Sequence, residues 1–276
     1  MGSEKLEKSL GMKDIHQLGF VKLLDVMGDD EEVENSARIS YGEGTRKTNQ
    51  TRNLIRYLMR HRHTSPFEMC EVKFHLKLPI FIMRQLVRHR TANLNEYSGR
   101  YSVMSNEFYL PEGDYLAKQS TTNKQGREDE TLPNKGSLQY EFNRIYDNAT
   151  IAYQVLLEED LSRELARAVL PVANYTECIW KIDLHNFFHF VKLRADSHAQ
   201  REIRDYADAM YELVKPNFPL CCEAFEDYRQ EAVTFSKQEM EIIKDNIGGS
   251  WTMDNYNLSE RESTEFLEKI KKGETE

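Results

Sequence analysis

Cysteine is scarce in this chain, and its placement excludes several kinds of site. The 276 residues include only four cysteines. None forms a C-x-x-C pair or stands at a zinc-ligand spacing, so we expect neither a disulfide framework nor a metal site. Reduced thiols of this kind are typical of a cytoplasmic protein. The four residues are Cys70, Cys178, Cys221 and Cys222.

Long apolar runs are also absent. No stretch approaches the roughly 20 apolar residues that a membrane-spanning helix needs. Residues 1–6 are polar, lack the apolar core of a signal peptide and do not match an N-myristoylation motif. We therefore expect no membrane partner, and we interpret residues 1–18 as a charged leader with some helical character.

The chain has no excess of positive charge. Its 37 Lys and Arg residues stand against 46 Asp and Glu residues, which gives a net charge of −9. A protein this acidic is a poor general binder of nucleic acid, because the phosphate backbone attracts Lys and Arg. The arginines instead gather locally in residues 88–102, which suits a small anionic ligand better than a polymer.

Residues 88–102, called the motif segment below, have the composition of an anion site. Its three arginines carry rigid forks of N–H donors that match phosphate oxygens. Gly99 lets the backbone come close to a ligand, Ser98 supplies a short donor, and Glu96 can accept from a ligand N–H or a sugar hydroxyl. From these residues alone we infer a phosphate-bearing ligand. The arginines are Arg88, Arg90 and Arg100.

Apolar periodicity predicts a mixed α/β chain. Alternating apolar and polar residues predict strands, and apolar residues three and four positions apart predict helices. No linker divides residues 19–228, so we expect one domain there. Residues 111–136 are polar and indicate a mobile loop or insertion, and residues 229–276 indicate a charged C-terminal extension. The predicted strands are 20–27, 72–78, 106–110 and 176–182, and the predicted helices are a short one from residue 29, then 48–62, 80–90, 138–159, 163–170, 184–198 and 202–214, with 242–247 and 266–270 in the extension.

Proline and serine positions set the expected helix boundaries. Pro79 favours the first turn of the helix at 80–90, which would place Gln85, Arg88 and His89 on one face. Pro66 disfavours a helical conformation for the residue before it, Ser65, so we expect a turn there. The helix at 163–170 is expected to begin with Ser162 as its N-cap and to stop at Pro171.

Several of these polar residues have an ordinary structural alternative. His63 fits a solvated helix end, and Gln85 and Arg163 fit exposed helix surfaces. His185 and His189 lie four apart and could in principle bind zinc. A glutamate general base is missing there, because Asn186 occupies its position, and we therefore expect no zinc.

Four separated segments resemble the motifs of one enzyme family. Arg-His-Arg at 88–90, followed seven residues later by Ser98 and then Gly-Arg-Tyr-Ser, resembles the signature of the flavin-dependent thymidylate synthases. The matches occur in the expected order and span most of residues 19–228. The other three are His-x-Ser-Pro-Phe-Glu at 63–68, Arg-Glu-Leu-Ala-Arg-Ala-Val-Leu-Pro at 163–171 and Arg-x-Asp-x-His-Ala-Gln at 194–200.

This resemblance implies a fold, a reaction and an assembly. The implied fold is a single mixed α/β domain with helices around a central sheet. The implied reaction is the reductive methylation of dUMP to dTMP. Methylenetetrahydrofolate supplies the carbon, and FAD reduced by NADPH supplies the reducing equivalents. The implied assembly is a homotetramer that holds each flavin where subunits meet.

The resemblance also implies roles for individual residues in two overlapping ligand sites. In the FAD site, His63 and Ser65 would come from another subunit. The residues implied for dUMP are Gln85, Arg88, Glu96, Tyr97, Ser98, Gly99, Arg100, Arg167 and Arg194. The residues implied for FAD are His63, Ser65, Arg88, His89, Arg90, Glu96, Asp183, His185 and His189.

Arg194 is the implied catalytic residue. Its guanidinium would lie against a uracil carbonyl and favour loss of the N3 proton, because a fixed positive charge stabilises the resulting anion. No cysteine stands in the Pro-Cys-His-Gln setting that supplies the nucleophile in the other class of thymidylate synthase. No histidine–carboxylate relay is evident for Ser98, so we expect the flavin to carry the difficult chemistry.

The chain departs from the family pattern at three positions. Asn93 stands where serine is usual, and Asp183 and His185 stand where an Asn-x-Arg pair is common. Loss of that arginine would remove one charged contact to the cofactor. These departures affect the details of the flavin contacts and not the reaction class.

Two rival functions are compatible with the motif segment. One is another flavoenzyme that binds a pyrimidine nucleotide without methylating it. The other is an RNA-binding module that stacks bases on interleaved aromatic and arginine side chains. The acidic total and the lack of a basic stripe elsewhere argue against the RNA-binding module. The residues that such a module would use are Arg88, Arg90, Tyr97, Arg100 and Tyr101.

Overall fold

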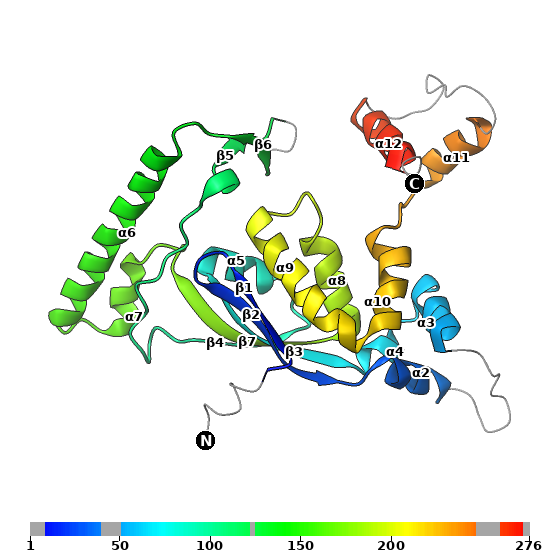
Figure 1. The fold of residues 1–276 in the computed structure, drawn as a ribbon, viewed down its shortest axis with the longest axis horizontal. Helices are drawn as coiled ribbons and strands as arrows, with labels where there is room; N and C mark the ends of the chain where they lie inside the picture. Colours follow the sequence, from blue (N-terminus) through cyan, green and yellow to red (C-terminus); the bar gives the residue numbers. More distant parts are fainter. Residues whose placement is uncertain (1–8, 40–50, 122–124, 247–259, 273–276) are drawn as a thin grey trace. The chain divides into compact units, whose positions relative to one another are not determined.

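The structure is a computed structural model that describes residues 9–39, 51–121, 125–246 and 260–272. The chain divides into two compact units, Met1–Phe225 and Glu226–Glu276, which are described separately. Figure 1 shows the fold. No helix among the described residues is both long enough and apolar enough to span a membrane.

A five-stranded sheet forms the centre of the first unit, and all neighbouring strands are antiparallel. The three long strands confirm the predictions from alternating residues. The helical character expected before residue 19 is wrong for the described part, which forms an edge strand at 11–15. The predicted strand at 106–110 is also wrong, because only Phe108 forms a bridge there, with Asn174. In spatial order the strands are β1 (Gly11–Ile15), β2 (Gly19–Met27), β3 (Glu71–Pro79), β7 (Tyr175–Asp183) and β4 (Asn93–Glu96).

One face of this sheet builds the core. Alternate residues of β3 and β7 are buried, and α8 (Leu184–Arg194) and α9 (Arg201–Val214) lie beside the sheet in Figure 1. The rings of Phe74 and Phe187 lie 5.8 Å apart, and those of Trp180 and Phe190 lie 5.2 Å apart. Truncating a buried Phe to Ala costs about 3–5 kcal/mol, so this aromatic layer holds α8 against the sheet.

Two helices are shorter than the periodicity predicts. α5 (Ile80–Leu86) ends at Leu86 and not at residue 90, because the next apolar residue, Val87, is exposed and does not pack on the core. The N–H groups of Arg88 and His89 donate to carbonyls only three residues back. The predicted sharing of one helical face by Gln85, Arg88 and His89 is therefore wrong. α8 ends at Arg194 and not at residue 198.

Two cap predictions also need correction. Ser65 is the first residue of α4 (Ser65–Glu68), with Pro66 in the first turn, so the expected exclusion of Ser65 from a helix is wrong. Ser162 does precede α7 (Arg163–Ala166), but its side chain makes no cap hydrogen bond. The backbone N–H groups of Leu165 and Ala166 instead donate to the Ser162 carbonyl.

Most of the remaining helices lie where the sequence predicts them, but the helix α10 was not predicted. In the first unit, the N-cap of α2 is Asp29, whose side chain accepts from the N–H of Glu32 at 2.9 Å. In the second unit, Ile242 and Phe266 are buried, and Lys269 pairs with Glu239. The bounds are α2 (Asp30–Arg38), α3 (Thr51–Arg60), α5 (Ile80–Leu86), α6 (Lys135–Glu158), η2 (Arg167–Val169), η3 (Lys215–Asn217), α10 (Pro219–Phe225), η4 (Glu226–Gln230), α11 (Lys237–Asn246) and α12 (Glu260–Lys272).

The described part of residues 111–136 contains regular secondary structure. It contains a short helical turn, η1 (Gly113–Tyr115), and a two-stranded hairpin of β5 (Ala117–Gln119) and β6 (Arg127–Thr131). Arg127 donates to the carbonyl of Tyr115 at 2.8 Å, which ties the hairpin to the turn before it.

Candidate functional site

The turn that follows α5 contacts the C-terminal end of α8. These two segments form the buried part of the candidate site. The Nε of Arg194 donates to Nε2 of His89 at 3.0 Å. His89 is only 9% exposed, and its ring lies 5.0 Å from that of Phe190 and 6.2 Å from that of His189. The predicted catalytic arginine and one predicted flavin residue are therefore direct neighbours.

His89 is held in its neutral form. Burial lowers its pKa most, and the electrostatic effects of the nearby Arg194 and His189 lower it further, to about 4. Since Nε2 accepts from Arg194, the ring proton belongs on Nδ1. A neutral histidine can orient the arginine without repelling it.

Positive charge accumulates around this pair. Burial lowers the pKa of Arg194, and the nearby charge of Arg88 lowers it further. Two guanidinium groups that share a partly buried region favour an anion between them. The described residues contain no group of three or more His, Cys, Asp or Glu side chains that could hold a metal.

Gln85 lies at the edge of the same region. Its Nε2 donates to Oε1 of Gln200 at 2.6 Å, and its backbone carbonyl lies 3.5 Å from Nη2 of Arg194. Gln200 belongs to the motif at 194–200, but sequence reasoning gave it no role. The signal that could have found it was its place at the end of that motif.

The middle of the motif segment lies at the edge of the sheet. Glu96 is the last residue of β4, and its Oε1 accepts from the hydroxyl of Thr176 at 2.9 Å. The hydroxyl of Tyr97 donates to the carbonyl of Val103 at 2.8 Å. These two bonds fix the start of the loop that carries Ser98.

The rest of the loop packs against α7 and the turn that follows it. Gly99 is buried, and a Cβ there would lie only 3.0 Å from Cδ of Arg167 and 2.8 Å from Sδ of Met104, so glycine is needed for this approach. The Nε of Arg100 pairs with Glu164 at 3.1 Å. Sequence reasoning missed Glu164 as a partner of the predicted nucleotide arginines.

An open cavity of about 540 Å³ adjoins this loop. Its lining includes Arg100, Tyr101, Arg163 and Glu164. Arg163 donates to the carbonyl of Tyr101 at 2.9 Å, which fits the structural alternative for that arginine. The cavity gives a ligand access to the exposed end of the motif segment.

Four of the predicted flavin residues, His63, Ser65, Asp183 and His185, lie around α4 and the start of α8, whereas Arg90 is exposed in the turn after α5. The exposed ring of His63 packs 5.9 Å from that of Tyr57. The N–H of Leu184 donates to the carbonyl of Cys70 at 2.9 Å, which places Asp183 and His185 beside α4. Asp183 is the N-cap of α8, and its carboxylate accepts from both the backbone and the side chain of Asn186.

Known proteins match this chain over most of its length. The family model described as "Thymidylate synthase complementing protein" matches residues 22–220. This chain belongs to that family. A flavin-dependent thymidylate synthase of Treponema denticola is 48% identical over 92% of this chain and 95% of its own length. That of Rickettsia bellii is 47% identical over 92% and 91%.

A solved member of the family shares the fold. The UMP/dUMP methylase PolB from Streptomyces cacaoi, bound with 5-Br dUMP, superimposes with a TM-score of 0.71 at 32% identity. The match covers 79% of this chain and 99% of PolB. The resemblance inferred from the motifs and the mixed α/β fold class are both confirmed.

Proposed function

We propose that this protein converts dUMP to dTMP, with methylenetetrahydrofolate as carbon donor and with FAD reduced by NADPH. The observation that carries the proposal is the Arg194–His89 pair beside Arg88 and Gln85, in a chain whose relatives are flavin-dependent thymidylate synthases. The coarser part, a flavin-dependent methylation of a uridine nucleotide, has the stronger support, because the solved PolB structures hold 5-Br dUMP and 5-Br UMP.

Arg194 is suited to stabilise a negative charge on the uracil ring. His89 occupies its Nε edge, so the Nη end is the part of the guanidinium that reaches a ligand. Its partial burial strengthens the electrostatic effect on a ring that loses its N3 proton. Arginine stays charged throughout and therefore acts as an electrostatic stabiliser and not as a base.

Arg100 and Arg167 are suited to bind the nucleotide phosphate. The Arg100–Glu164 pair is exposed, with 57% of each side chain accessible, and such a pair contributes only about 0–1 kcal/mol. A phosphate can therefore replace Glu164 at low cost. The proposed dUMP residues are Gln85, Arg88, Glu96, Tyr97, Ser98, Gly99, Arg100, Arg167 and Arg194.

The residues present also fit a flavin. Exposed Arg88 and Arg90 can pair with a diphosphate, and the exposed ring of His63 offers a flat surface. Asp183 contributes less, because its carboxylate caps α8. When bound, the flavin supplies the reducing equivalents for the methylation. The proposed FAD residues are His63, Ser65, Arg88, His89, Arg90, Glu96, Asp183, His185 and His189.

An assembly of several copies would complete such a site. His63 and Ser65 belong to α4 and the turn before it, just before the middle strand β3, whereas Glu96 ends the edge strand β4. α6 exposes a row of large apolar side chains, among them Ile145 at 49%. Exposed apolar patches mark interaction surfaces, which supports a homotetramer with the flavin between subunits.

The cysteines support a mechanism without a thiol nucleophile. All four are buried, and none of them forms a disulfide. Burial raises the pKa of Cys70 and of Cys178 to about 12, far from the range of a reactive thiolate. Four cysteines without a disulfide also favour a reducing compartment such as the cytoplasm.

The first test is a visible spectrum of the purified protein, followed by NADPH oxidation with and without dUMP. We expect flavin absorption, oxidation stimulated by dUMP, and formation of dTMP when methylenetetrahydrofolate is added. Assays with UMP in parallel decide whether the ribonucleotide is a second substrate, as the relation to PolB suggests. Failure to bind FAD would overturn the proposal, and flavin without methylation would favour another nucleotide-binding flavoenzyme.

A further inference from the structure

Glu96 is the one carboxylate among the residues proposed for dUMP, and its backbone is held against β7. The pairing of β4 with β7 places Glu96 opposite Cys178. The next backbone N–H, that of Tyr97, donates to the carbonyl of Glu177 at 2.8 Å. The main chain at Glu96 is therefore fixed, and the remaining freedom lies in its side chain.

The side chain of Thr176 restricts this freedom. Its hydroxyl donates to Oε1 of Glu96 at 2.9 Å. On paired antiparallel strands, a residue two positions from the direct partner lies on the same face and within reach of a long side chain. Thr176 stands two positions before Cys178 on β7. The hydrogen bond therefore follows from the register of the two strands.

Thr176 is suited to hold a carboxylate in one orientation. It is only 3% exposed, and the branching at its Cβ restricts rotation of its side chain. Glu96 is exposed, and a glutamate side chain has much rotamer freedom to lose when it is fixed. The Thr176 hydroxyl is therefore the rigid member of the pair, and the Glu96 carboxylate is the member that is positioned.

We propose that Thr176 is a positioning residue of the nucleotide site, which holds Oε1 of Glu96 so that Oε2 is presented to the ligand. An ionised carboxylate only accepts hydrogen bonds. Within the described part of the chain, Oε2 has no hydrogen-bond or ion-pair partner. It can therefore accept from a ring N–H or a sugar hydroxyl of the nucleotide. This inference rests on the proposed function, because it takes Glu96 as a dUMP residue.

The first test removes the hydroxyl and keeps nearly the same shape. Thr176→Val retains a β-branched residue, which suits a strand. In the full-length holoenzyme we expect the KM for dUMP to rise about tenfold, the scale of one lost hydrogen bond. The kcat should change less than about twofold, because Glu96 acts in binding. Thr176→Ser keeps the hydroxyl and should recover most of the wild-type KM, and failure of this rescue would contradict the proposal.

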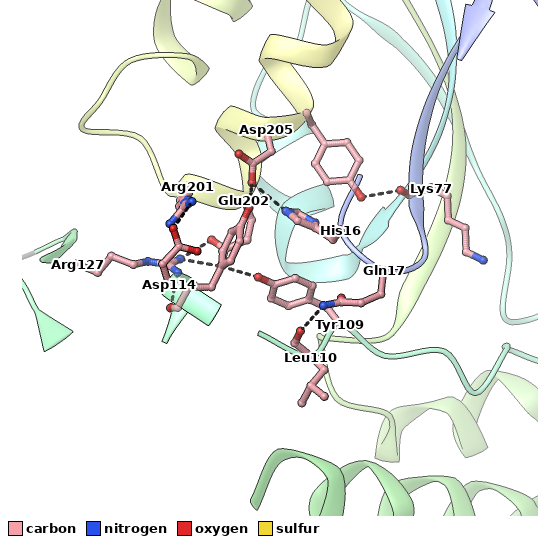
Figure 2. A network of polar contacts seen from close by, with 12 residues as sticks. His16, Gln17, Lys77, Tyr109, Leu110, Asp114, Arg127, Arg201, Glu202 and Asp205 are labelled. Carbon is pink, nitrogen blue, oxygen red and sulfur yellow. Dashed lines mark hydrogen bonds and ion pairs between the residues drawn. The ribbon is translucent and has the colours of Figure 1, made fainter. Parts of the chain in front are cut away.

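Tyr109→Phe is a matched control for the loss of a buried hydroxyl. Tyr109 is 4% exposed, and its hydroxyl donates to the carboxylate of Glu202 at 3.1 Å, in the polar network that joins the β5–β6 hairpin to α9 (Figure 2). Arg127 still pairs with Glu202 in this variant. Tyr109→Phe should keep the wild-type KM for dUMP. An equal rise of the KM in Tyr109→Phe and Thr176→Val would overturn the proposal.

A double substitution separates positioning from an independent effect of Thr176. In a Glu96→Ala background, Thr176→Val should add nothing further to the KM for dUMP, because no carboxylate is left to hold. The proposal is overturned if the two effects simply add. It is also overturned if Glu96→Ala raises this KM while Thr176→Val leaves it at the wild-type value.

One further readout does not depend on activity. In crystal structures, the wild type should show one conformation of the Glu96 side chain, with Oε1 bonded to Thr176. Thr176→Val should show this carboxylate turned away or in several conformations, and an unchanged Glu96 would overturn the positioning role by itself. If the wild type failed to bind or methylate dUMP, the proposed function would fall, and the crystallographic comparison would still decide whether Thr176 positions Glu96.

Discussion

The buried and exposed halves of the candidate site are built by different means. Arg194, the last residue of α8, is held in one orientation by His89, which is only 9% exposed. At the end of the motif segment, Arg100 and Glu164 form a pair that is more than half exposed. The buried half is organised before a ligand arrives, as catalysis by fixed charges requires, whereas the exposed half can exchange partners.

The largest effect should follow removal of the partly buried guanidinium of Arg194. We expect Arg194→Ala to retain the flavin spectrum and to lose about 100- to 1,000-fold in dTMP formation, the scale for one electrostatic stabiliser. Stopped-flow and steady-state assays with methylenetetrahydrofolate measure the loss. Arg194→Lys is the control, because it keeps the positive charge but lacks the planar set of guanidinium N–H donors. It should recover part of the rate. Normal turnover in Arg194→Ala would contradict this role.

A substitution at Arg88 tests whether this exposed side chain next to Arg194 serves both ligands. Arg88→Ala should weaken dUMP and FAD binding together, each by about 1.5–3 kcal/mol, because one charge-assisted contact is lost to each. Equilibrium titrations with FAD and with dUMP give the two dissociation constants. Unchanged affinity for both would remove Arg88 from the site.

Substitutions in the exposed half should have smaller effects, and they should raise or lower the KM for dUMP depending on the residue. Arg100→Ala should raise the KM for dUMP about tenfold at low salt and less at high salt, where screening is stronger. Glu164→Gln should lower this KM by up to about twofold, because it releases Arg100 from an exposed pair. Equal effects of the two substitutions in the same direction would show that Glu164 does not compete with the phosphate.

The smallest effect concerns pH and the neutral state of His89. Its pKa falls from 6.5 to about 4 in the folded chain, so the unfolded chain binds the extra proton first. Stability should therefore be complete above about pH 6.5 and decrease as the pH falls toward 4. Thermal unfolding of wild type and His89→Gln across this range should show a smaller pH dependence in the variant. A steeper dependence in His89→Gln would contradict the assignment.

The sequence by itself determined the core elements and the family. Alternating residues at 72–78 and 176–182 identified the two central strands, because a half-buried sheet face demands that period. The family motifs predicted Arg88, Arg194 and the loop after Glu96 as site residues. The alternation of residues and the family motifs are both local in the chain, and they can therefore be recognised without a structure.

The tertiary structure alone decided which of these residues meet. Nothing local shows that Arg194 donates to His89, that Glu164 pairs with Arg100, or that Arg127 reaches Glu202 across 75 positions. Helix ends were also decided this way: α5 stops at Leu86 because no further apolar residues pack beneath it. Contacts between distant residues depend on how the sheet and helices pack, and local propensity carries no information about that packing.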